Sequence, residues 1–146
     1  MLDSSWVTAM PRSKLIYLAA PYTHEDPQVR ETRFQLINGA ASHLMRAGVH
    51  LFSPISHTHP IALAGGLPTG WDFWRSYDET MLSACGAIVV LMLAGWDTSK
   101  GVTAEVSIGE KIGLPIWWTR NNPNALDDVA REFKSALVPE LKAKAL

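Results

Sequence analysis

The stretch AIVVLMLAGWDTSKGVTAEVSIGEKIG, residues 87–113, decides the fold. It opens with an unbroken apolar run at residues 87–93, which is typical of a strand buried on both faces of a parallel sheet. A polar loop follows, and residues 101–112 are then expected to form a helix that ends at Gly113. A strand followed by a helix is the repeating unit of α/β proteins. The stretch also sets a carboxylate, Glu105, in an early turn of this helix.

The same alternation continues on both sides of this stretch. Short apolar runs predict strands, and apolar residues at helical spacing predict helices. The expected strands are residues 14–20, 49–54, 87–93 and 114–118, and the expected helices are residues 28–47, 71–85, 101–112 and 125–137. Residues 55–70 are expected to form a long loop, a lid or an intersubunit segment. The pattern predicts an α/β, single-domain Rossmann/flavodoxin-like three-layer sandwich with a mostly parallel sheet of four or five strands.

Composition narrows the function classes. The chain of 146 residues suits one domain, 1–146, with residues 1–12 expected to be a flexible amino terminus. A net charge of −1 gives no basic footprint, so a nucleic-acid polymer is not an expected partner. No apolar run approaches the roughly 18 residues of a membrane span. The single cysteine, Cys85, excludes an intrachain disulfide, and the beginning of the chain lacks an apolar signal core, so a cytoplasmic location is expected.

In open parallel sheets, ligands bind beyond the carboxyl ends of the strands, at the point where the strand order reverses. This rule directs attention to the loops at residues 20–28, 54–70 and 94–101. In the last of these loops, Gly101 lets the backbone approach a ligand closely, and the helix start after it offers N–H groups to an anion. Neither a GxGxxG nor a Walker pattern is present, so a dinucleotide or P-loop triphosphate site is not expected.

Three segments carry a family resemblance: YLAAPY at residues 17–22, YDETMLSACGAIVVLM at 77–92 and SKGVTAEVSIGEKIGLPI at 99–116. Together they resemble the nucleoside 2-deoxyribosyltransferase superfamily, and the similarity spans roughly residues 14–118. The functional branch that the chain resembles is the nucleoside 5′-monophosphate N-glycosidases. The order of the elements carries the resemblance: a tyrosine in the first strand, an aspartate in a middle helix, and Gly-x-x-x-Glu after the third strand.

The resemblance implies roles for particular residues. Glu105 matches the catalytic nucleophile, Tyr17 the tyrosine that orients it, and Asp78 the acid that assists departure of the base. Ser99 stands where the transferases carry an aspartate that contacts the sugar; a hydroxyl donates to a phosphate, whereas a carboxylate would repel it. With Gly101, it is expected to hold the phosphate. Further substrate contacts are expected from Pro21, Tyr22, Thr23, His57, Trp71 and Trp74, and the phosphate contacts of the first loop from Tyr22, Thr23, His24 and one of Arg30 or Arg33.

These roles predict a hydrolase that cleaves the N-glycosidic bond of a (deoxy)ribonucleoside 5′-monophosphate to free base and sugar phosphate. Cleavage of a glycosidic C–N bond builds positive charge on the sugar, which a carboxylate stabilises or attacks while a second acid protonates the base. The alternatives are a nucleoside 2-deoxyribosyltransferase that exchanges bases, and a non-catalytic nucleotide sensor. No metal or organic cofactor is expected, and the resemblance implies a homodimer or a larger homo-oligomer.

Each candidate residue also has an ordinary structural explanation. Glu105 would complement a helix dipole, Tyr17 would fill the core, Asp78 would be solvated, and Ser99 would cap a helix. The other alternative is zinc: His57 and His59 would point the same way in an extended segment and, with Asp72, Asp78 or His50, would supply ligands. The sequence lacks an HExxH motif or a cysteine pair, which disfavours that alternative.

Overall fold

A computed structural model of the protein describes residues 13–137. The expected flexible segment 1–12 lies outside the described residues. Four strands form one sheet in the order β2-β1-β3-β4, and every neighbouring pair is parallel. The strands are β1 (Ile16–Ala19), β2 (Leu51–Phe52), β3 (Ala87–Leu91) and β4 (Ile116–Thr119). The predicted α/β sandwich with a parallel sheet is therefore confirmed.

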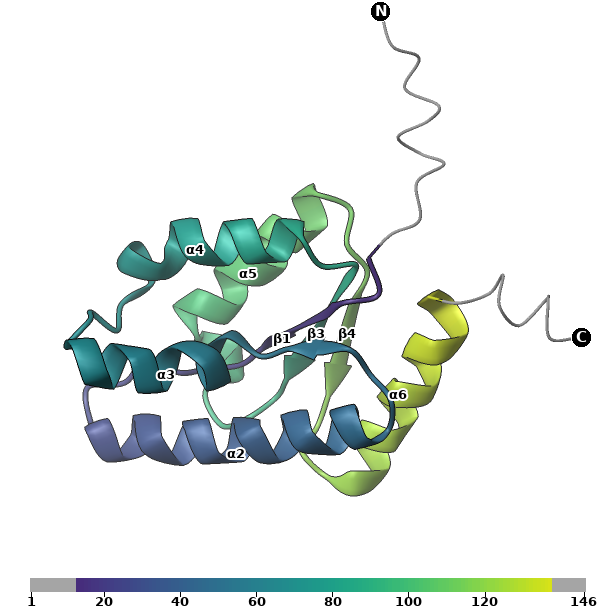
Figure 1. Ribbon diagram of the computed structural model, residues 1–146, viewed down its shortest axis with the longest axis horizontal. Coiled ribbons are helices and arrows are strands. Elements are labelled where there is room, and N and C mark those ends of the chain that lie inside the picture. Colours follow the sequence, from purple (N-terminus) through teal and green to yellow (C-terminus); the bar gives the residue numbers. More distant parts are fainter. Residues whose placement is uncertain (1–12, 138–146) are drawn as a thin grey trace, which may run out of the picture.

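Helices cover both faces of this sheet (Figure 1). They are α2 (Pro27–Arg46), α3 (Pro54–Gly65), α4 (Trp71–Ser83), α5 (Lys100–Lys111) and α6 (Pro123–Leu137), with a 3₁₀ turn, η1 (Trp96–Thr98), before α5. Successive side chains of a strand point to opposite faces, so β1 serves two cores. Ile16 and Leu18 pack with α2 and α6, whereas Tyr17 and Ala19 pack with α4 and α5. None of the helices in the described part of the chain is long and apolar enough to span a membrane.

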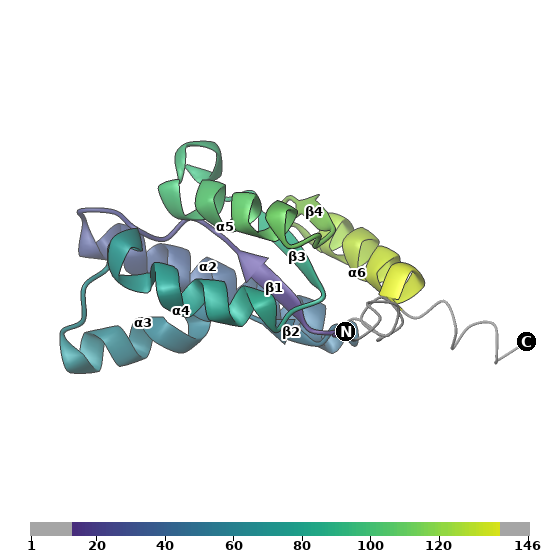
Figure 2. The same ribbon diagram turned by 90° about the horizontal axis from the view of Figure 1, so that it is seen from above.

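The expectation of a long loop at residues 55–70 is wrong, because its first two thirds form α3. Pro54 occupies the beginning of the helix, where its missing N–H is harmless, and Gly66 ends the helix with φ of +63°. Pro60 lies within α3 and made the segment look irregular, since proline normally breaks helices. Tertiary packing offsets that cost, because α3 lies along α2 (Figure 2) and buries His59 and Ala62.

The strand order sets the place of the site. From β1 the chain crosses to β2 on one side of the sheet, and β3 pairs on the other side of β1. The carboxyl ends of β1 and β3 therefore flank the point where the strand order reverses, which is the ligand-binding position of such sheets. The segments that leave these two ends, residues 20–26 and 92–99, lie at that position.

Candidate active site

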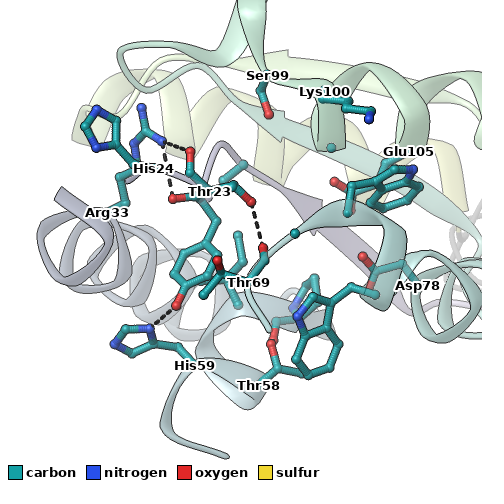
Figure 3. Close-up of a pocket in the computed structure, with 18 of the residues that line it drawn as sticks. Thr23, His24, Arg33, Thr58, His59, Thr69, Asp78, Ser99, Lys100 and Glu105 are labelled. Carbon is teal, nitrogen blue, oxygen red and sulfur yellow. Dashed lines mark hydrogen bonds between the residues drawn. The ribbon is translucent and has the colours of Figure 1, made fainter. Parts of the chain in front are cut away.

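A cavity of about 530 Å³ lies at the carboxyl edge of the sheet, a size that suits a small molecule. The loop after β1, helix α3, the beginning of α4 and the beginning of α5 all contribute to its wall. Figure 3 shows Glu105 and Asp78 on one side of it and His24 and Arg33 on the other. The cavity therefore has an acidic side and a basic side.

Glu105 lies in the second turn of α5, and its side chain is only 6% exposed. It shares the buried face of the helix with Val102 and Gly109, which pack on the sheet and so point the carboxyl toward the end of β1 and β3. Burial, reinforced by the negative charge of Asp78, raises the pKa of Glu105 to about 8, and a contact with Tyr17 opposes the rise. The carboxyl is thus a poorly hydrated group on a cavity wall.

Asp78 reaches the same place from α4, where it is half-buried. Burial raises its pKa to about 6, and a contact with Tyr17 again opposes the rise. The negative charge of Asp78 adds to the rise at Glu105, whereas burial is what raises the pKa of Asp78. Between about pH 6 and pH 8 the pair holds one proton, so one carboxyl can act as an acid and the other as a base.

Tyr17 lies behind this pair in the middle of β1, fully buried and in ring contact with Phe52 at a centroid distance of 6.0 Å. Burial and the charges of Glu105 and Asp78 raise its pKa well above the ordinary value. Among the described residues, its hydroxyl has no hydrogen-bond partner of regular geometry. It nevertheless lies close enough to Glu105 and Asp78 to stabilise their ionised forms and so to lower the pKa of each. Tyr17 supports the cavity from behind and does not line it.

The beginning of α5 forms another part of the wall. Ser99 is the N-cap of the helix, and its Oγ accepts a hydrogen bond from the N–H of Val102 at 3.2 Å. Its O–H proton is still available to a ligand. A Cβ added to Gly101 would lie 3.9 Å from each of Ser99 Oγ, Glu105 Oε1 and the ring of Trp71. These three groups therefore surround one open position, which the glycine leaves accessible.

The loop after β1 forms the opposite wall. Tyr22 and Thr23 line the cavity, whereas Pro21 is buried behind it. Thr23 Oγ1 donates to the Thr69 carbonyl at 2.9 Å, and the Arg33 guanidinium donates to the carbonyls of Tyr22 at 3.3 Å and Thr23 at 3.1 Å. The same guanidinium donates to the carbonyl of Ala94 at 3.3 Å and so joins the loop after β1 to the loop after β3.

Trp71 and Trp74, at the beginning of α4, line the cavity as aromatic surfaces. His57 does not line it: its Nδ1 hydrogen bonds to the Tyr77 hydroxyl at 3.0 Å on an exposed part of α3. Because this segment is helical, His57 and His59 do not point the same way, and His59 alone reaches the cavity. In the part of the chain that the structure describes, no three His, Cys, Asp or Glu side chains come together as a metal site.

Residues 14–120 match a family model described as a domain of unknown function, DUF1937. The chain belongs to this family. No curated protein matches the chain. The DUF1937 region runs from the beginning of β1 to the end of β4, and it contains Tyr17, Asp78 and Glu105 together with the whole cavity wall. All of α6 lies beyond it.

The DUF1937 cavity also has wall residues that the sequence did not assign to a substrate, among them Thr58, His59 and Lys100. Thr58 and His59 were missed because α3 was expected to be a loop, so the spacing of its side chains carried no directional information. Lys100 could have been assigned from the sequence. A lysine at the first position of a helix is unfavourable next to the positive end of the helix dipole, which suggests a role in binding.

Proposed function

We propose that this DUF1937 protein cleaves the N-glycosidic bond of a (deoxy)nucleoside 5′-monophosphate and releases free base and sugar phosphate. One observation carries the proposal: two carboxyls from different elements, Glu105 and Asp78, line the wall of one cavity at the carboxyl edge of the sheet, and burial raises the pKa of both. Retaining glycosidases use two carboxyls, one as nucleophile and one as acid and then base. The segments that resemble the nucleoside 2-deoxyribosyltransferase superfamily contain the same two residues.

In the proposed reaction, the Glu105 carboxylate attacks C1′ of the sugar, the C–N bond breaks, and Asp78 gives its proton to the departing base. Water then attacks C1′, returns a proton to Asp78 and frees Glu105. In the free protein the shared proton lies on Glu105, which has the higher pKa. The reaction therefore requires that this proton reach Asp78 as the C–N bond begins to break. Positive charge that develops on the sugar favours that move, because it stabilises the ionised form of Glu105.

The phosphate is proposed to bind between the beginning of α5 and the loop after β1, where donors from both segments line the cavity. The hydroxyl of Ser99 and the first N–H groups of α5 suit an anion, and Lys100 adds a positive charge. The rings of Trp71 and Trp74 provide surfaces on which a nucleobase stacks. The cytoplasmic location and the homo-oligomeric state stay predictions.

The experiment is chromatographic detection of free base from a panel of ribo- and deoxynucleoside monophosphates, with and without an added acceptor base. We expect base release by the wild type and a loss of roughly 10³-fold or more in Glu105→Gln. Glu110→Gln is the matched control, because Glu110 is an exposed residue of the same helix. Release only of an exchanged nucleoside would indicate a deoxyribosyltransferase. No release and no exchange would contradict an enzyme and favour a nucleotide sensor.

A further inference from the structure

A second hydrogen-bonded chain of side chains reaches the cavity, on the side away from the carboxyl pair (Figure 3). The Tyr22 hydroxyl, from the loop after β1, contacts His59 Nδ1, and His59 Nε2 lies 2.8 Å from Glu31 Oε2 on α2. His59 is only 4% exposed, and the ring of Phe34 packs on it at a centroid distance of 4.3 Å. The proposed glycosidase reaction makes no use of this chain.

The proton positions follow from Glu31. Hydrogen bonds from Gln35, at 2.9 Å, and from His59 lower the pKa of Glu31, so it is a carboxylate and can only accept. The Nε2 atom of His59 therefore carries a proton. In neutral histidine, Nδ1 is then bare, so the Tyr22 O–H donates to it. As a result, the Tyr22 oxygen can only accept, either from Arg30, which lies next to it, or from a ligand in the cavity.

The neighbouring groups suit the opposite kind of ligand, one that accepts hydrogen bonds. His24 Nδ1 accepts from the N–H of Asp26 at 3.0 Å, which leaves Nε2 as the nitrogen that donates. Arg33 adds a positive charge to the same side of the cavity (Figure 3). When the Tyr22 O–H turns to an anionic oxygen that binds there, His59 Nδ1 loses its hydrogen bond, and a proton gained by Nδ1 restores one by donating to the Tyr22 oxygen.

We propose that binding of a phosphate monoester at Tyr22 is coupled to the uptake of one proton by His59, with Glu31 as the positioning residue that stabilises the imidazolium. The proton comes from solvent and goes to Nδ1; Tyr22 keeps its own proton and turns it toward the ligand, and no covalent bond between heavy atoms changes. The inference rests on the proposed function for the nature of its ligand, a sugar phosphate. It assigns His59 and Glu31 to the site and makes phosphate binding depend on pH.

The charges around His59 allow this uptake. The titratable groups of the loop after β1 and of α2 are Tyr22, which is neutral, and His24, Arg30, Glu31 and Arg33, and from α4 Asp72 and Asp78 line the same cavity. The Glu31 carboxylate stabilises an imidazolium directly. The two arginines oppose it, and the two charges of a phosphate monoester offset them when the ligand is bound.

The test uses ¹⁵N NMR of the histidine side chains in Glu105→Gln protein, which removes turnover and the titration of that carboxyl. The probe is 2-deoxyribose 5-phosphate at pH 8, where the phosphate is already a dianion. We expect His59 to carry one proton, on Nε2, in the free protein and two in the saturated complex. The dissociation constant should rise between pH 7 and pH 8.5, approaching tenfold per pH unit, the limit for one coupled proton.

Two variants that leave the buried histidine in place test the mechanism. Tyr22→Phe and Glu31→Gln, made in the same background, should weaken binding at pH 7 and flatten its pH dependence. Tyr77→Phe is the matched control, because Tyr77 contacts His57 in a second tyrosine–histidine pair that does not line the cavity. This control should bind as its parent does.

Three results would overturn the inference: absence of binding, a His59 that stays neutral in the saturated complex, or an unchanged pH dependence in Tyr22→Phe. Base release by the wild type is measured separately. An enzyme that releases base while His59 stays neutral would retain the proposed function and lose only this inference.

Discussion

At the scale of the residue, Glu105 is subject to two opposed effects. The beginning of a helix favours an anion, by about 0.3–1 kcal/mol at an exposed site. Burial and the neighbouring Asp78 favour the neutral acid, and they prevail, because the pKa of Glu105 is raised to about 8. The position of the residue therefore does not stabilise the fold at neutral pH. A group kept in a state that costs stability is typical of an active site.

The destabilising effect of Glu105 leads to a prediction of how the free energy of unfolding depends on pH. Below pH 4.5, Glu105 is neutral in the folded and the unfolded chain; from there to about pH 8, only the unfolded chain ionises it. The free energy of unfolding should therefore fall as the pH rises through this window, by about 2–4 kcal/mol from this group, since one pKa unit corresponds to about 1.4 kcal/mol. In Glu105→Gln the fall should be smaller, and the variant should be more stable than the wild type at pH 8. Urea unfolding at pH 5, 6, 7 and 8 measures the free energy of unfolding of both proteins.

Glu110→Gln is again the control, and it should follow the wild type at each pH. Equal slopes for wild type and Glu105→Gln would show that Glu105 ionises at its ordinary pKa in the folded protein. That result would also remove the argument that the two carboxyls share a proton at neutral pH.

The sequence predicted which residues line the cavity better than it predicted their protonation states. Eight of the eleven assigned residues line one cavity, because loops at the carboxyl ends of parallel strands must meet: Tyr22, Thr23, Trp71, Trp74, Asp78, Ser99, Gly101 and Glu105. Tyr17 and Pro21 lie behind the wall, and His57 lies on an exposed part of α3. Proton sharing by Glu105 and Asp78 depends on burial and on distance across elements, which no local pattern encodes.

At the scale of the element, α3 shows where local signals fail. Its sequence holds two prolines and ends at a pair of glycines, Gly65 and Gly66, which are signals typical of loops. The helix forms because one proline occupies the first turn and because the helix packs along α2 with His59 buried. Tertiary contact outweighed local propensity there. The consequence is functional, since the Tyr22–His59–Glu31 chain exists only if this segment is a helix.

Ser99, at the beginning of α5, has two proposed roles, as the N-cap of the helix and as a contact for the phosphate. Different substitutions separate these roles. Ser99 accepts the N–H of Val102, and serine and aspartate are equally good N-caps. We expect Ser99→Ala to lower the free energy of unfolding by about 1 kcal/mol, whereas Ser99→Asp should keep it close to the wild-type value. In contrast, Ser99→Asp should lose phosphate binding by charge repulsion and should turn the preference from nucleoside monophosphates toward nucleosides. Urea unfolding and a competition assay with both substrate types measure the two effects.

Ser107→Ala is a suitable control, because Ser107 is exposed on the same helix, does not line the cavity and does not cap α5. If Ser99→Asp kept the wild-type preference for monophosphates, Ser99 would be a helix cap and nothing more. The phosphate would then have to be held by other groups of the cavity.

At the scale of the whole molecule, the alternation of strands and helices was enough to predict the layers and the parallel sheet. The rule for parallel sheets then pointed to the edge of the sheet where the cavity lies. What the sequence could not supply is the depth to which α5 sits on the sheet, because that depends on complementary surfaces far apart in the chain. Gly109 allows α5 to approach the sheet closely, because a Cβ at this position would lie 2.2 Å from Cδ1 of Ile88, a fully buried residue of β3.

Gly109 lies one helical turn after Glu105 on the same buried face, so the close approach that it permits also sets where the carboxyl lies. Gly109→Ala should therefore lower the free energy of unfolding by about 1–3 kcal/mol, the usual cost of overpacking, although alanine is the better helix former. It should also reduce base release several-fold in the protein that stays folded, because α5 must move away from β3 and carry Glu105 with it. Ser107→Ala, on the exposed face of the same helix, should change neither quantity. A Gly109→Ala protein with lower stability and full activity would mean that Ile88 alone adjusts and that the seating of α5 does not position the nucleophile.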